Sequence, residues 1–194
     1  MAHYDNETVT PLFRPEAPSP FAALLERRIV FLRGPLEADK ANEVAAQLLA
    51  LDASSGEDVT LYIDSSGGEA SGMFALYDTM QYMRSPVHTR CVGLAASAGA
   101  FLLATGTGRR SATPNARIVL QQPSGEAEGT AADIAVHAQQ VAAQRRQVEE
   151  ILARRTGQAV ERIQADLDRD LWLTASEAVD YGLIDEIATR DRDA

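Results

Sequence analysis

Ser97 is the residue of this chain whose surroundings most favour nucleophilic chemistry. It lies in the segment Cys91-Val92-Gly93-Leu94-Ala95-Ala96-Ser97-Ala98-Gly99-Ala100-Phe101, between a short apolar run and a stretch with helical spacing. A strand that turns sharply into a helix at a serine exposes the hydroxyl and directs helix N-terminal N–H groups at whatever binds there. Turns of small residues also occur where they serve only close packing. The local pattern therefore leaves open whether Ser97 is a nucleophile or part of a packing turn.

Composition limits the classes of function. The chain has 194 residues, which suits one domain with a sizeable core. Its 28 acidic and 18 basic side chains give a net charge of -10. Because the basic residues do not cluster, we expect no nucleic-acid partner and no membrane partner. The chain has neither a signal peptide nor an apolar stretch of membrane-spanning length, so we expect a cytoplasmic protein.

Metal and disulfide chemistry have little support in the sequence. A single cysteine, Cys91, excludes an internal disulfide and is expected to be a buried strand residue. The three histidines are scattered and show no metal-ligand spacing. We therefore expect no metal and no cofactor.

Apolar patterning predicts an alternation of strands and helices. Strands are expected over 29–32, 59–63, 87–92, 117–120 and 183–187, and helices over 41–49, 71–83 and 131–155 and directly after Ser97. A capping box at Thr174-Ala175-Ser176-Glu177 and a stop at Gly182 indicate a further short helix. The alternation predicts an α/β fold built from parallel βαβ units.

Several motifs together resemble the ClpP family of serine peptidases, the proteolytic subunits of the Clp protease, whose fold is related to crotonase. They occur in the family's order and cover roughly residues 21 to 190. The matching segments are Leu61-Tyr62-Ile63-Asp64-Ser65-Ser66-Gly67-Gly68, Tyr77-Asp78-Thr79-Met80-Gln81, Gly93 to Leu103, Pro114-Asn115-Ala116-Arg117, Gln122-Pro123, Thr156-Gly157-Gln158, Asp168-Arg169-Asp170 and Glu177 to Asp185.

The resemblance implies roles for individual residues. Ser97 falls on the family's nucleophile and Asp170 on the carboxylate that orients the catalytic histidine. The oxyanion hole carries over to the backbone N–H groups of Gly68 and Ala98, and substrate contact to Gly67 and Gly125. A glycine pair suits this place because a residue without Cβ lets the backbone approach a developing oxyanion closely. Ser66 stands where the family usually has proline.

The general base departs from the family's pattern. Gln121 precedes Gln122-Pro123, where the family has its catalytic histidine. A carboxamide can hydrogen-bond to a serine but does not accept a proton near neutral pH, so general-base activation fails here. Other residues that could serve as the general base are remote from Ser97 in the expected fold. They are His3 in the arm, His88 early in its strand, His137 on the long helix, and the single lysine, Lys40, on the first helix.

The resemblance also implies an architecture. We expect ClpP/crotonase-like repeated ββα units over 21–190, with a projecting handle over 124–155, a proline-containing arm over 1–20 that the family would use as an axial loop, and a tail over 191–194. Intradomain packing of the long helix is the alternative. Family members stack as two heptameric rings, bind an AAA+ unfoldase in apolar clefts, and degrade peptides and unfolded proteins. Tyr62 and Tyr82 are candidates for such a cleft, or for ordinary core packing.

These observations predict a ClpP-family subunit that is catalytically impaired and acts within a ring assembly. Glu126 and Glu128 would repel their counterparts across paired handle strands, so the second ring is expected to come from a different paralogue. The alternatives are an active serine endopeptidase with a compensating base, a non-catalytic structural or decoy subunit, and, remotely, a crotonase-like acyl-CoA role.

Overall fold

The computed structural model describes residues 19–122 and 130–189. Over these ranges it contains seven helices and seven strands. In chain order they are α1 (Pro20–Leu25), β1 (Ile29–Leu36), α2 (Ala38–Ser54), β2 (Val59–Gly68), α3 (Ala70–Tyr82), β3 (Val87–Ala96), α4 (Ala98–Ala104), β4 (Arg110–Ala112), β5 (Arg117–Leu120), α5 (Ala131–Thr156), α6 (Val160–Leu167), β6 (Leu171–Thr174), α7 (Ala175–Tyr181) and β7 (Glu186–Ile187). Among these helices, none is long and apolar enough to cross a membrane.

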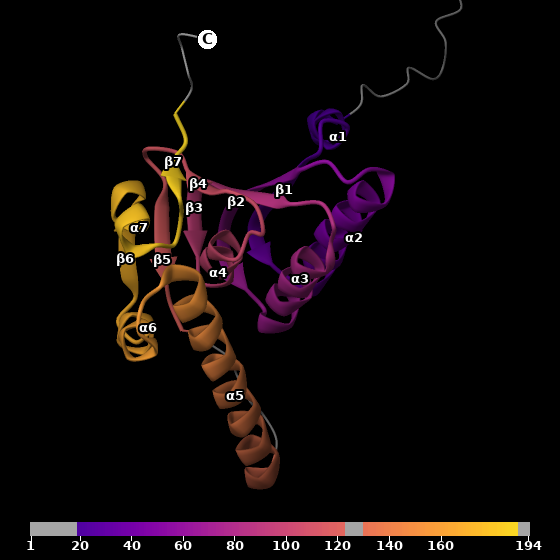
Figure 1. Ribbon diagram of the computed structural model, residues 1–194. Helices are drawn as coiled ribbons and strands as arrows, with labels where there is room; N and C mark the ends of the chain where they lie inside the picture. The colour runs from indigo at the N-terminus through magenta and orange to yellow at the C-terminus, as the bar shows by residue number, and fades with distance from the viewer. Residues whose placement is uncertain (1–18, 123–129, 190–194) are drawn as a thin grey trace, which may run out of the picture.

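One sheet organises the molecule. Its strands run in the order β1-β2-β3-β4-β7, all paired in parallel, and β5 pairs with β3 in parallel while β6 pairs with β5 in antiparallel fashion. In Figure 1, α2, α3 and α4 lie below the strands and the short α1 lies above them. The expected parallel βαβ organisation is confirmed. Fully buried side chains of the sheet and of these helices form the core, with Leu61, Ile63, Leu76 and Phe101 among the largest.

The two strands that approach Ser97 are longer than the sequence indicated. β3 continues to Ala96, and its register with β2 shifts between Ile63 and Ser65. The shift is accommodated at Gly93, whose φ is +85°, while Asp64 Oδ1 accepts the N–H of the next residue, Leu94, at 3.1 Å. A glycine in the left-handed region lets a strand bulge and then resume its pairing. β3 therefore ends at the residue directly before Ser97.

The long helix is present as predicted and extends away from the sheet (Figure 1). A reciprocal capping box between Thr130 and Asp133 begins α5, and Gly157 ends it in the left-handed conformation. Cys91 is fully buried in β3, as expected, and this burial raises the pKa of its thiol to about 12. The other half of the predicted handle, 124–129, lies outside the described residues.

The sequence patterns did not predict several short helices and strands. α1, β4, α6 and β6 were not predicted, and the strand expected over 183–187 is only Glu186–Ile187. The N–H groups of Leu183 and Ile184 both donate to the carbonyl of Ala178, so these two buried residues close α7 instead of extending the sheet. Pairing with β4 begins where Glu186 meets Ser111.

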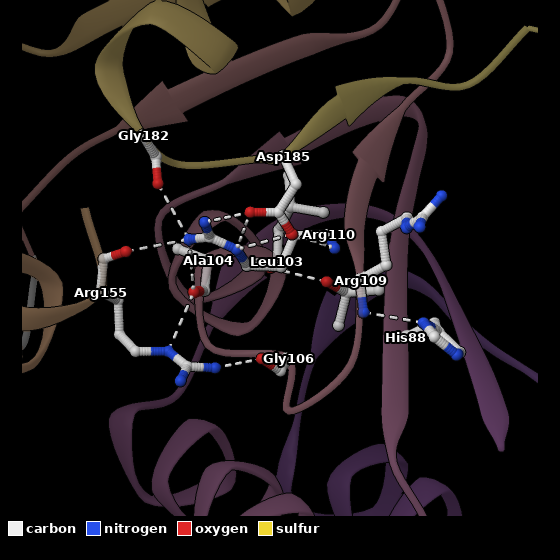
Figure 2. A network of polar contacts seen from close by, with 10 residues as sticks. His88, Leu103, Ala104, Gly106, Arg109, Arg110, Arg155, Gly182 and Asp185 are labelled. Atoms are coloured by element: carbon white, nitrogen blue, oxygen red, sulfur yellow. Dashed lines mark hydrogen bonds and ion pairs between the residues drawn. The ribbon is translucent and has the colours of Figure 1, made fainter.

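Arg110 joins three helix ends beside the sheet (Figure 2). Its guanidinium donates to the carbonyls of Ala104, Arg155 and Gly182, at the C-terminal ends of α4, α5 and α7, at 3.3, 3.1 and 2.9 Å. It also pairs with Asp185 at 2.5 Å. Burial alone would raise the pKa of Asp185, but the hydrogen bonds and charge of Arg110 outweigh it and hold that pKa below its ordinary value. A positive charge beside helix C-termini is electrostatically favourable. Arg110 therefore stabilises the C-terminal end of the long helix α5.

Replacing Arg110 is therefore expected to destabilise the fold. Arg110→Gln removes the donor to the carbonyls of Arg155 and Gly182 and the ion pair with Asp185, which we expect to lower the free energy of unfolding by about 2–4 kcal/mol. The matched control is Arg109→Gln, which removes an exposed ion pair with Glu186 and is expected to change stability by about 0.5 kcal/mol or less. Urea denaturation monitored by circular dichroism measures both, and equal losses in the two variants would contradict the assignment.

Candidate active site

Ser97 occupies a sharp turn between β3 and α4. Its φ of 51° and ψ of −117° are rare for a residue with a side chain and mark local backbone strain. Hydrogen bonds hold the turn on both sides: the Ser97 N–H donates to the carbonyl of Val119, and the Ser97 carbonyl accepts the N–H of Phe101, each at 3.0 Å. Within the described ranges the hydroxyl has no hydrogen-bond partner and borders a cleft. The turn thus presents the hydroxyl to incoming molecules.

The end of β2 lies directly against this turn. A Cβ on Gly67 would lie 2.7 Å from the Ser97 Cβ and 2.8 Å from the carbonyl oxygen of Ala96, and the φ of Gly67 is +90°. A Cβ on Gly68 would overlap the carbonyl of Leu36 in β1. Both positions consequently require glycine, and β2 can approach Ser97 only because they have it.

The residues expected to bind the oxyanion lie beside Ser97. Ala98 is the first residue of α4, so its N–H belongs to the unpaired first turn of a helix. Gly68, Ser97, Ala98 and Gln121 border the same pocket. Their arrangement is compatible with two backbone donors converging near the serine, and this role remains a prediction.

Gln121 and Asp170 are brought together by the pairing of β5 with β6. Leu120 lies opposite Leu171 in this antiparallel pair, so the residue after β5 faces the residue before β6. Gln121 Nε2 donates to Asp170 Oδ2 at 3.2 Å. The structure thus brings Gln121 and Asp170 together, and their roles toward Ser97 stay predictions.

A second set of contacts supports this pair, and it was missed by sequence reasoning. Gln122 donates to Asp168, and Arg145 of α5 donates to the same Asp168 carboxylate at 2.9 Å. Arg145 also pairs with the buried Glu149 at 2.6 Å, and this hydrogen bond raises the pKa of Arg145. The long helix is thereby tied to the segment that carries Asp170. The one sequence signal for these contacts was that Asp168 lies two residues before Asp170.

The cleft has a polar part and an apolar part. Ser66, Gln122, Asp168 and Asp170 border the polar part with Ser97, Gln121 and Leu167. The adjoining apolar pocket is narrow and partly open to solvent. It is bordered by Ala70, Met73, Phe101, Leu120, Val148, Leu152 and Leu167, together with Gly68, Ser97, Ala98 and Gln121.

Along the described parts of the chain, neither part of the cleft is bordered by a histidine or a lysine. His88 begins the same strand that ends before Ser97, and its Nδ1 accepts the N–H of Arg109 at 2.7 Å (Figure 2). With Nδ1 accepting, Nε2 is the ring nitrogen left to donate to Asp58 Oδ2, 2.8 Å away. Lys40 pairs with Glu43 on α2, and His137 is exposed on α5. His3 and the predicted substrate-contact residue Gly125 lie outside the described residues.

Comparison with known families decides the classification. The profile of the Clp protease family matches residues 15–191, which is most of the chain. The chain belongs to the Clp protease family. The mixed α/β sheet with its projecting helix agrees with the ClpP/crotonase-like fold. Family membership makes the chain a ClpP-type proteolytic subunit.

The two tyrosines considered for a docking cleft have different surroundings. Tyr62 is half-buried and stacks on Phe31 with ring centroids 5.0 Å apart. Tyr82 is 83% exposed at the end of α3, so core packing is excluded for it. Among the residues that the structure describes, no group of three or more His, Cys, Asp or Glu side chains is placed to hold a metal ion.

The contact between Gly67 and Ser97 can be tested by adding one methyl group. Gly67→Ala forces the Ser97 turn or β2 to move and is expected to lower the free energy of unfolding by about 1–3 kcal/mol. Gly56→Ala is the matched control, because a Cβ there meets nothing within 4 Å and its φ is not positive. We expect this control to be neutral or slightly stabilising in thermal denaturation. A Gly67→Ala variant as stable as the control would contradict the close approach.

Proposed function

We propose that this chain is a proteolytic-core subunit of an ATP-dependent Clp protease that cannot activate its own serine. The observation that carries the proposal is the hydrogen bond from Gln121 Nε2 to Asp170 Oδ2. It gives the carboxamide the partner that a catalytic histidine would have, beside an otherwise suitable serine turn. This arrangement supports a serine-peptidase-like site in which the residue beside the carboxylate does not accept a proton.

The chemistry follows from the two ends of the carboxamide. Its nitrogen is a donor and is directed at Asp170, so its oxygen is the remaining group that can face the Ser97 hydroxyl. That oxygen accepts a hydrogen bond but does not take the proton when serine attacks a carbonyl. Loss of one triad member lowers kcat by roughly 10⁴ to 10⁶, and the remaining catalysis comes from the oxyanion hole and from binding.

Ring assembly is part of the same proposal. Family membership supports stacked heptameric rings forming a tetradecamer, with an AAA+ unfoldase as partner and unfolded proteins or peptides as substrates, in the cytoplasm. The projecting α5, with Ile134 and Val136 exposed, would provide the contact between rings. Burial of such apolar side chains against a second ring is favourable. An active paralogue in the second ring would supply the hydrolysis that this chain lacks.

Activity of the purified chain tests the central part of the proposal. We expect hydrolysis of a short fluorogenic peptide to be no faster than that of Ser97→Ala, because no base accepts the serine proton. Gln121→His is expected to raise kcat/KM by about 10² or more, whereas Gln121→Asn, another carboxamide, is expected to remain inactive.

Two results would contradict this account. Hydrolysis by the unmodified chain that Ser97→Ala abolishes would show a compensating base. Absence of any gain in Gln121→His would show that the site is impaired elsewhere, with the Ser66 turn the first place to examine.

Assembly is tested separately by native mass spectrometry. When the chain is mixed with a catalytically active ClpP paralogue, we expect tetradecamers that contain both subunits. The chain alone is the control. Homo-tetradecamers as the only product of mixing would count against a paralogous second ring, and they would leave the activity measurements interpretable for the single-chain assembly.

A further inference from the structure

Ser65 is a buried serine of β2 whose hydroxyl lies behind the Gly67–Gly68 pair. The residue is 1% exposed and belongs to the alternating set of β2 residues that face the core. Its hydroxyl donates to the carbonyl oxygen of Gly34 in β1 at 2.6 Å and accepts the N–H of Gly67 at 3.2 Å. The hydroxyl therefore has a protein partner both as donor and as acceptor, as a buried polar group requires.

The acceptor of this hydrogen bond lies at a bulge between β1 and β2. Arg33 lies opposite Asp64 and Pro35 lies opposite Gly67, so a single residue of β1, Gly34, faces two residues of β2. The φ of Gly34 is +69°, a left-handed conformation that glycine adopts without strain. The serine hydroxyl thus joins the two strands at the place where their regular pairing is interrupted.

Ser65 also contacts the first turn of α4. A Cβ on Gly99 would lie 3.1 Å from the carbonyl oxygen of Ser65 and 3.4 Å from its Cβ. Gly99 is two residues after Ser97, and Gly67, whose N–H the hydroxyl holds, lies against Ser97 itself. Ser65 therefore touches both segments that carry the expected oxyanion donors, which are the end of β2 and the start of α4.

A glycine pair needs outside contacts to keep one conformation. Gly67 and Gly68 both have positive φ values, +90° and +156°, and glycine has more backbone freedom than any other residue. The hydrogen bond from the Gly67 N–H to Ser65 restrains the pair at its first peptide group. Donors to an oxyanion act only when they are held in place, and a misplacement of about 1 Å can lower a rate by about 10²-fold.

We propose that Ser65 is a positioning residue that holds the Gly67–Gly68 pair where the Gly68 N–H can donate to an oxyanion formed at Ser97. The hydroxyl does not touch the substrate and acts through the backbone of the glycine pair. This role rests on the serine-peptidase site of the proposed function, with Gly68 and Ala98 as oxyanion donors. It does not depend on which group accepts the serine proton.

The test is the phosphorus chemical shift of a fluorophosphonate adduct on Ser97. The serine oxygen bonds to phosphorus and fluoride leaves, so the phosphoryl oxygen of the adduct takes the place of the oxyanion. Labelling of the full chain is taken to completion by prolonged incubation and checked by mass spectrometry. Phosphorus NMR then compares the folded adduct with the same adduct unfolded in urea. We expect a shift difference in the unmodified chain and loss of most of that difference in Ser65→Ala.

Ser85→Ala is the matched control. Ser85 is also fully buried, and its hydroxyl donates to the carbonyl of Ser55 at 3.1 Å and accepts from Arg28 at 3.3 Å. It precedes the start of β3, whereas Ser97 follows the end of that strand. The control variant should be less stable in thermal denaturation and should keep the full shift difference.

A second variant covers a failure of Ser65→Ala to fold. Ser65→Cys keeps a side chain of similar shape with a weaker donor and acceptor, and we expect it to lose part of the shift difference. Retention of the full difference in the folded Ser65 variants would overturn the proposal. Equal shifts for the folded and unfolded adducts of the unmodified chain, or an equal loss in Ser85→Ala, would overturn it as well. A base that activates Ser97 would change the rate of labelling and not the shift of the completed adduct, so a failure of the proposed inactivity is seen separately.

Discussion

The close approach of the Gly67 backbone to the Ser97 turn is the constraint on which the site depends. It brings the end of β2 against the junction of β3 and α4, where a Cβ would lie 2.7 Å from that of Ser97. The turn is strained, with φ at 51°, and is held by hydrogen bonds to Val119 in β5 and Phe101 in α4. Strain of this kind persists only where the surrounding structure fixes it from several sides. Three strands and a helix therefore place a single hydroxyl.

The second determinant is the contact between the ends of β5 and β6. Gln121 and Asp170 meet there because Leu120 pairs with Leu171, and Arg145 fixes the same segment through Asp168. In the proposed account, geometry and proton chemistry are separable. The carboxamide makes a hydrogen bond to the carboxylate that we propose orients the site, but it does not take the serine proton. The family's fold is retained around a reaction that we infer the chain cannot start alone.

Much of this arrangement could be predicted from the sequence, because apolar periodicity and the motifs around Gly67, Ser97 and Gln121 are local signals. The parallel pairing followed from strand–helix alternation, and the long helix followed from the helical spacing of its apolar residues. The continuation of β3 past Gly93 could not be predicted, since it depends on Asp64 receiving the Leu94 N–H from another strand. The three-residue β4 is too short for periodicity, and Arg145 reaches Asp168 only through tertiary packing.

The most direct measurement of the central claim is the rate at which a fluorophosphonate labels Ser97 as a function of pH, in the unmodified chain and in Gln121→His. Labelling requires an activated serine, and a histidine base gives a rise in rate around its pKa near 6.5. The account predicts slow labelling without such a rise in the unmodified chain, and fast labelling with a rise in Gln121→His. A comparable rise near neutral pH in the unmodified chain, lost in Ser97→Ala, would contradict it.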